Sequence, residues 1–222
     1  PIHDDDVVHE AGLRAQWALL RSAMSQPVLL WLFVLAFLMY GFSHVPFVFG
    51  QPFIAEALAA GGWQADAPMV SGSVSAVMML ISVLASLVAL RLRKRIGLTA
   101  ILLLAFAMQI GLIATLTLTD NALAIAVLLL RMVPDSWSHP FIVARIQPML
   151  ADAGRATFLS LQSFTGRLMF AGSLFIASRN APATGEMAYS DIQVTLGWYA
   201  GVGAVMFIIL IIAARRIQIE QE

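Results

Sequence analysis

The sequence VLLWLFVLAFLMYGFSHVPFVF at residues 28–49 contains no Asp, Glu, Lys or Arg. A helix needs about 20 predominantly apolar residues to cross the hydrocarbon core of a bilayer, so this stretch predicts a transmembrane helix. Residues 69–90, 97–119 and 192–214 are equally free of charged side chains. The sequence therefore predicts four uncharged membrane-spanning helices.

Two further stretches are long and apolar but carry charges. Residues 122–150 include Arg131, Asp135 and Arg145, and residues 156–178 include Arg167. Charged side chains inside a bilayer are costly and often mark functional positions. With these two stretches, the sequence predicts an all-α membrane protein with six transmembrane helices.

The composition agrees with a lipid environment and excludes other classes of protein. Of the 222 residues, 60% are hydrophobic and 12% are charged, whereas soluble domains are about 25% charged. The formal net charge is zero, so no basic field is present to attract nucleic acid. Cysteine is absent, and the histidines and acids lack metal-ligand spacing, so we expect no disulfide, metal site or other cofactor.

The chain divides into three expected segments: a cytoplasmic linker with an amphipathic helix (1–27), a six-helix bundle (28–216) and a cytoplasmic tail (217–222). In the linker, Trp17, Leu20 and Met24 recur at helical spacing, which is typical of a helix lying on the membrane surface. A frayed linker is the alternative interpretation. The chain begins with Pro1 and an acidic stretch rather than a signal peptide, so we expect it to start inside a longer protein.

The distribution of basic residues predicts the orientation in the membrane. Short loops rich in Lys and Arg stay on the cytoplasmic side. Lys and Arg gather before the first span, after the second, between the fourth and fifth, and after the sixth: Arg14, Arg21, Arg91, Arg93, Lys94, Arg95, Arg145, Arg155, Arg215 and Arg216. Both termini are therefore expected in the cytoplasm.

Three charged residues are predicted to lie at similar depth in the membrane. Asp135 falls roughly 20 Å from the outer end of the fourth span and Arg167 roughly 18 Å from the outer end of the fifth, at 1.5 Å per residue. Arg131 precedes Asp135 by one helical turn. We therefore predict a network of these three side chains between the two spans, which either binds an anionic part of a substrate or ties the helices together.

Two histidines are candidates for proton transfer because histidine titrates near neutral pH. His139 follows Asp135 by one turn, and His44 lies in the first span near Gln51. Either histidine could instead serve as an ordinary hydrogen-bonded residue. Gln109 and Gln162 are further polar side chains within the predicted spans.

Proline and glycine predict irregular or closely packed helices. Proline removes a backbone donor and kinks a helix, so breaks are expected in or just beyond the first span and within the fourth. The prolines concerned are Pro46, Pro52, Pro134, Pro140 and Pro148. Gly72, Gly166 and Gly172 supply small surfaces through which helices can approach one another.

An enzymatic role is not supported by the serine and histidine positions. The sequence SGSVS at residues 71–75 does not give the Gly-x-Ser-Gly turn of an intramembrane serine protease, and the last span contains no histidine to act as base. A six-span membrane scaffold or subunit that does not transport, or a six-helix carrier acting as a dimer, remains an alternative.

Several motifs resemble the C-terminal six-helix half of bacterial transporters of the major facilitator superfamily. The first span ends in YGFSHVPFVFG at residues 40–50, and ALRLRKRIG at residues 89–97 is similar to the basic inter-helix motif of that family. The fourth span combines Arg131 with Pro140, and RATFLSLQSFTGRL at residues 155–168 is similar to the penultimate helix of many members.

The resemblance implies a proton- or gradient-driven carrier of a small solute in the bacterial plasma membrane, with an N-terminal six-helix half as the missing partner. It implies a substrate site between the two halves, lined by the first, second, fourth and fifth spans. The candidate substrate or coupling residues are His44, Gln51, Arg131, Asp135, His139, Gln162 and Arg167. The candidate gating residues are Arg91, Arg93, Lys94, Arg95 and Arg155.

Overall fold

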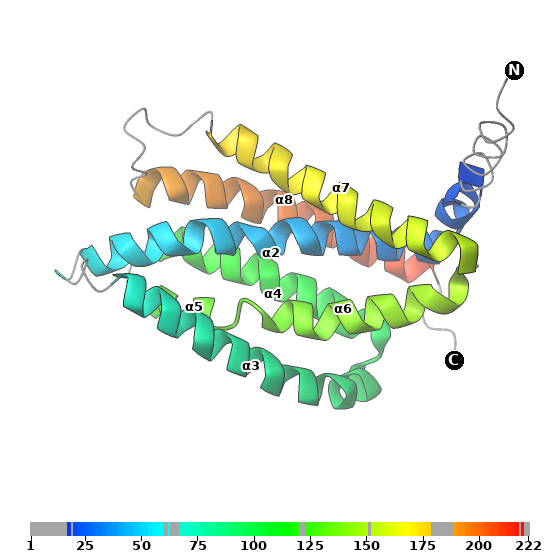
Figure 1. Cartoon of the computed structure of the whole chain (residues 1–222), viewed down its shortest axis with the longest axis horizontal. Helices are drawn as coiled ribbons and strands as arrows, with labels where there is room; N and C mark the ends of the chain where they lie inside the picture. The colour runs from blue at the N-terminus through cyan, green and yellow to red at the C-terminus, as the bar shows by residue number, and fades with distance from the viewer. Residues whose placement is uncertain are drawn as a thin grey trace, which may run out of the picture.

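The computed structural model describes residues 17–18, 20–59, 62, 67–119, 123–150, 152–178, 189–217 and 219, which form helices and no strand. The elements are α2 (Pro27–Ala59), α3 (Ala67–Ile96), α4 (Leu98–Leu118), α5 (Leu123–Leu128), α6 (Val133–Ile146), a 3₁₀ turn (Gln147–Met149), α7 (Asp152–Ser178) and α8 (Tyr189–Arg216). The long helices run in alternating directions, so the start of α2 and the end of α8 lie at the same end of the bundle (Figure 1).

Four helices in the described part of the chain are long and apolar enough to cross a membrane. They span Pro27–Gly50, Pro68–Ile96, Leu98–Leu118 and Ile192–Arg216. These segments coincide with the four uncharged stretches of the sequence, so that prediction is confirmed. The fold is therefore an all-helical bundle compatible with an integral membrane protein.

The two charged stretches take a different form. The expected fourth span is divided into α5 and α6 by a turn at residues 129–132. The expected fifth span forms one helix, α7, that is long enough to cross a bilayer but is more polar than the other four.

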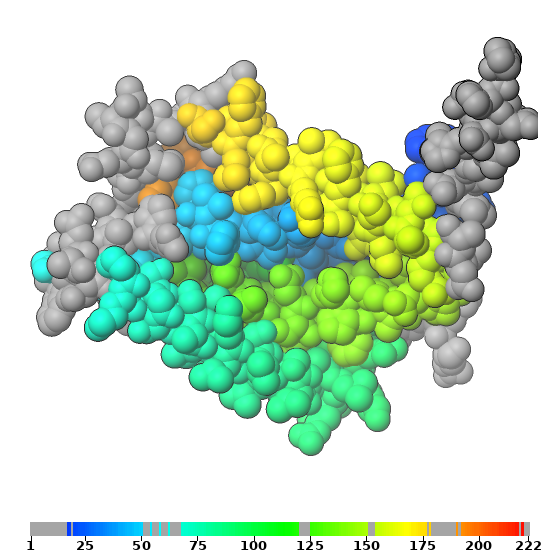
Figure 2. All heavy atoms as spheres, viewed as in Figure 1, coloured from blue at the N-terminus to red at the C-terminus, as the bar shows by residue number. Residues whose placement is uncertain are grey.

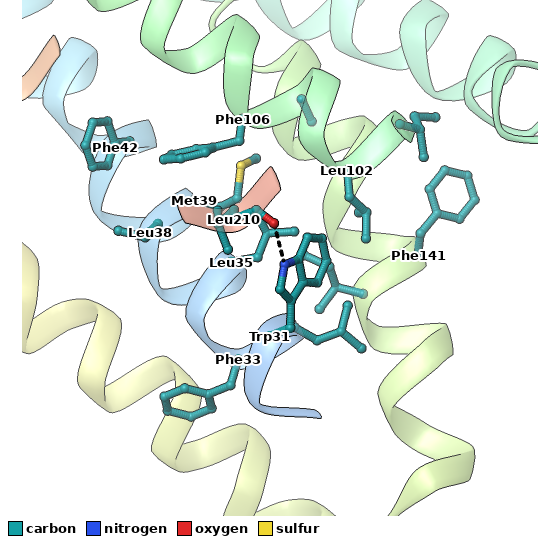
Figure 3. Close-up of a cluster of buried hydrophobic side chains, with 14 of the residues drawn as sticks. Trp31, Phe33, Leu35, Leu38, Met39, Phe42, Leu102, Phe106, Phe141 and Leu210 are labelled. Carbon is teal, nitrogen blue, oxygen red and sulfur yellow. Dashed lines mark hydrogen bonds between the residues drawn. The ribbon is translucent and has the colours of Figure 1, made fainter. Parts of the chain in front are cut away.

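Helix α2 occupies the centre of the bundle and contacts all the other long helices. Its inner side is formed by large apolar side chains that are fully or almost fully buried. The indole Nε1 of Trp31 donates a hydrogen bond of 3.1 Å to the carbonyl oxygen of Leu210 on α8 (Figure 3). Further along α2, Phe42 packs edge to face against Phe106 of α4, with ring centroids 5.3 Å apart. These contacts fix α2 against α4 and α8.

Glycines allow α7 and α8 to approach α2 closely. A Cβ atom at Gly203 of α8 would lie 2.6 Å from the ring of Phe42, and one at Gly166 of α7 would lie 2.9 Å from the ring of Tyr40. The predicted packing role of Gly166 is thus confirmed. At Gly72 and Gly172 an added Cβ would meet nothing within 4 Å, so the same prediction was wrong for those two positions.

The predicted break near Pro46 and Pro52 is absent, whereas the fourth span is interrupted as expected. Helix α2 continues through both prolines to Ala59. Val45 and Phe49 are buried around Pro46, and this packing offsets the loss of a single backbone hydrogen bond. In the fourth span, the 129–132 turn precedes Pro134, Pro140 lies inside α6, and Pro148 lies in the 3₁₀ turn.

The segment before α2 is helical at residues 20–25. Leu20 and Met24 pack against the core, whereas Trp17 is 68% exposed. The apolar side chains of Leu20 and Met24 therefore contact the bundle itself. Most of the predicted linker (1–16) and of the predicted tail (218 and 220–222) lies outside the described residues.

Candidate functional site

A groove of about 740 Å³ opens between α2, α6 and α7. It brings together four of the residues predicted from the sequence, namely His44, Asp135, His139 and Gln162. Figure 2 shows this face of the molecule, with α2 lying in a furrow between α7 on one side and α6 on the other. The groove concentrates titratable and amide side chains within an otherwise apolar bundle.

The interruption between α5 and α6 determines where Asp135 lies. Backbone bonds in the turn join residues three apart, with Arg131 N donating to Leu128 O at 3.0 Å and Val133 N donating to Leu130 O at 3.0 Å. Helix α6 then starts at Val133, which places Asp135 in its first turn. A carboxylate is favourable there because backbone N–H groups and the helix dipole point toward it.

Two side-chain contacts hold α6 against α3 and orient its groove face. The hydroxyl groups of Ser82 and Ser136 lie 2.6 Å apart, and Trp137 Nε1 donates to the carbonyl oxygen of Ala85 at 3.0 Å. Neither contact could be predicted from the sequence, because each depends on how α3 and α6 pack. With Trp137 turned toward α3, the helical period directs Asp135 and His139 into the groove.

His44 is held in one orientation by its own helix and by aromatic neighbours. Its Nδ1 lies 2.7 Å from the carbonyl oxygen of Tyr40, which can only accept, so Nδ1 carries the hydrogen. The ring stacks on Tyr40 with centroids 4.2 Å apart and lies 4.9 Å from the ring of Phe170 on α7. Nε2 has no hydrogen-bond partner among the described residues.

Asp135 is the electrostatic centre of the site. It interacts with His139, His44 and Arg131, although no ion pair or hydrogen bond to its carboxylate is present among the described residues. Two histidines on different helices thus line the same groove as this carboxylate.

Arg131 lies beside the groove and is held by non-ionic contacts. Its guanidinium carbon lies 5.0 Å from the centroid of the Phe47 ring, and its Nε lies 3.3 Å from the sulfur of Met78. It lines a second cavity of about 200 Å³ together with Ser43, His44, Phe47, Met132 and Asp135. Arg131 and Asp135 therefore line the same cavity, but the predicted direct contact between them is not formed among the described residues.

Arg167 is not brought into the predicted network. Its side chain is exposed, and it is not among the residues that line the groove. Phe164 and Leu168, which are 61% and 60% exposed, lie three residues before it and one residue after it on the same face of α7. The direction of the Arg167 side chain could not be predicted from the sequence, because it depends on how α7 is rotated about its axis.

The remaining predicted residues have diverse surroundings. Gln162 Oε1 is buried and has no hydrogen-bond partner among the described residues. Gln109 is only 2% exposed and lies on α4 away from the groove, and neither of its polar side-chain atoms has a partner in the described part of the chain. Gln51 lies within α2, but its side chain is outside the described part of the structure.

The candidate gating residues occupy the end of the bundle where α3 turns into α4. Gly97 makes this turn with a φ of 88°, which favours glycine. Arg93 is placed over the ring of Phe141, 5.1 Å from its centroid, whereas Arg91, Lys94 and Arg95 are exposed. Arg155 Nη2 donates to the carbonyl oxygen of Gln147 at 3.0 Å. Arg93 therefore links α3 to α6, and Arg155 links α7 to the preceding 3₁₀ turn.

A comparison of the chain with known protein families, curated proteins and solved structures finds no significant match.

Proposed function

We propose that this chain is the C-terminal half of a secondary carrier of the major facilitator type, which moves a small polar solute with proton coupling. The observation that carries the proposal is the groove between α2, α6 and α7, where His44, Asp135, His139 and Gln162 meet in an apolar bundle. Polar and titratable residues inside a membrane bundle typically mark a substrate or proton pathway.

The architecture is compatible with six membrane crossings. Helix α7 has 27 residues and is roughly 40 Å long at 1.5 Å per residue, which exceeds the hydrocarbon thickness. The interrupted pair α5 and α6 runs between the same two ends of the bundle (Figure 1). Irregular backbone at membrane depth is tolerated where it lines a cavity, and Arg131 in the 129–132 turn lines one.

The basic residues support an orientation with both termini in the cytoplasm. They occupy the last turns of α3, α6 and α8, which all point to the end of the bundle where α2 begins (Figure 1). Because loops rich in Lys and Arg stay on the cytoplasmic side, this end is assigned to the cytoplasm. In a bacterial cell the corresponding membrane would be the plasma membrane.

The exposed Arg167 supports the need for a second half. An arginine facing lipid near the middle of a span costs about 2.5–3.5 kcal/mol on insertion scales. Water or protein must therefore cover this face of α7. A second helical half placed against α2, α6 and α7 would enclose the groove and cover this face of α7.

Solute-driven proton movement tests the proposal. The full-length native protein would be reconstituted into liposomes containing a trapped pH-sensitive dye, and amino acids, organic anions, organic cations and sugars would be added in turn. We expect at least one solute class to move protons, and Asp135→Asn to abolish this movement while the protein remains inserted. If no solute class moves protons with the unaltered protein, the alternative of a non-transporting scaffold or subunit is favoured.

A further inference from the structure

Arg131 and Asp135 form a pair of opposite charges that lie near each other without neutralising each other. They are four residues apart across the start of α6, and both line the cavity of about 200 Å³. Among the described residues no ion pair joins them. Arg131 is directed toward Phe47 and Met78, and the carboxylate of Asp135 accepts no hydrogen bond from a described side chain.

The cavity between these charges has room for a small molecule. One water molecule needs about 10–15 Å³ of such space, so about 200 Å³ accommodates a compound of several heavy atoms. Its remaining walls offer the hydroxyl of Ser43, the imidazole of His44 and the apolar side chains of Phe47 and Met132. A bound molecule would therefore meet one cationic group, one anionic group and a mostly neutral surface.

Partly buried charges in an apolar bundle favour a ligand that neutralises both of them. A simple anion would pair with Arg131 but would be repelled by Asp135, and a simple cation would have the opposite difficulty. A guanidinium group binds carboxylates through two parallel hydrogen bonds, and a carboxylate accepts hydrogen bonds from an ammonium group. One molecule carrying both groups satisfies both side chains.

We infer that the cavity between Arg131 and Asp135 binds a small zwitterion, with its carboxylate on Arg131 and its ammonium group on Asp135. This inference rests on the proposed function, because it names the chemical class of the solute that enters the groove. His44 and His139 face Asp135 from α2 and α6, and the groove residues contributed by α7, Leu159, Gln162 and Ser163, are uncharged. The zwitterion would thus meet Asp135 beside its two candidate proton partners.

Binding of simple probes to the purified full-length protein tests the inference. Glycine, β-alanine and 4-aminobutanoate provide zwitterions with increasing charge separation, while acetate and methylammonium each carry one of the two charges. Dissociation constants would be measured by calorimetry in detergent at neutral pH. We expect at least one zwitterion to bind about tenfold or more tightly than either single-charge probe.

Charge-removing variants locate the site. Arg131→Gln and Asp135→Asn should each weaken binding of that zwitterion by about tenfold or more, and Arg131→Lys should restore part of the loss. Arg167→Gln is the matched control, because it removes the same charge from an exposed position outside the cavity, and it should leave binding unchanged. Circular dichroism would confirm that each variant remains helical.

Three results would overturn the inference: no zwitterion binds, acetate binds as tightly as the best zwitterion, or Arg131→Gln and Arg167→Gln behave alike. The liposome assay separates this failure from failure of the proposed function. Transport of a solute that is not zwitterionic would overturn only the ligand class, whereas zwitterion binding without any solute movement would overturn only the carrier.

Discussion

Replacing Gly203 by alanine tests whether the contact between α8 and α2 is as close as the structure shows. The new Cβ would lie 2.6 Å from Cε1 of Phe42 and 3.0 Å from Cγ1 of Ile110. Phe42 is only 1% exposed and packs against Phe106, so its ring has little room to move away. The helices must therefore separate or the ring must leave its preferred position.

The magnitude follows from two opposing effects. Overpacking a well-packed core costs about 1–3 kcal/mol. Alanine is favoured over glycine inside a helix by about 1 kcal/mol, which reduces the net loss. Gly201→Ala is the matched control, because Gly201 lies on the same helix with nothing within 4 Å of an added Cβ. The helix preference cancels between the two variants, so Gly203→Ala should be about 1–3 kcal/mol less stable than Gly201→Ala.

Reversible unfolding in mixed micelles, followed by circular dichroism, would measure this difference in the free energy of unfolding. The expected gap corresponds to about 5- to 150-fold in the unfolding equilibrium constant. Equal stability of the two variants would refute the close contact between Gly203 and Phe42. Greater stability of Gly203→Ala would refute the central position of α2 against α8.

Two further pairs of substitutions test the interior and the groove. Gln109→Leu should raise the free energy of unfolding by about 1–3 kcal/mol because both polar atoms of Gln109 are buried without partners. Gln193→Leu should lower the free energy of unfolding by about 1 kcal/mol, because Gln193 Nε2 donates a hydrogen bond of 2.9 Å to Thr117 O. Equal destabilisation of both variants in the same unfolding assay would contradict the structure. Gly166→Ala should displace the ring of Tyr40, which stacks on His44, and so shift the imidazole resonances of His44 in an NMR spectrum. The His44→Gln variant would identify those resonances by their loss. Gly172→Ala should leave those resonances in place, and equal shifts in the two variants would show that Gly166 does not position His44.

Features that depend on local composition could be predicted from the sequence. The uncharged stretch at residues 28–49 lies within α2 because length and apolarity alone decide whether a helix can cross a membrane. Asp135 and His139 were expected on the same side of one helix because four residues make about one turn, and the groove contains both.

Features that depend on neighbouring helices could not be predicted. The persistence of α2 through Pro46 depends on buried contacts around it, and the direction of Arg131 depends on Phe47 and Met78, which lie on other helices. The exposure of Arg167 likewise depends on how α7 is rotated about its axis. A single sequence specifies the period of a helix, but the rotation of the helix follows from packing.

The difference between four strongly apolar helices and two charged segments has a consequence for biosynthesis. The apolar helices can partition into a bilayer one at a time, whereas each central Arg or Asp opposes partitioning by about 2.5–3.5 kcal/mol. The charged α6 and α7 lie in the chain between α4 and α8, which pack against each other. A ribosome-bound chain that ends before α8 would lack this closing contact. We therefore expect α5 to α7 to settle into the membrane only after α8 has emerged from the ribosome.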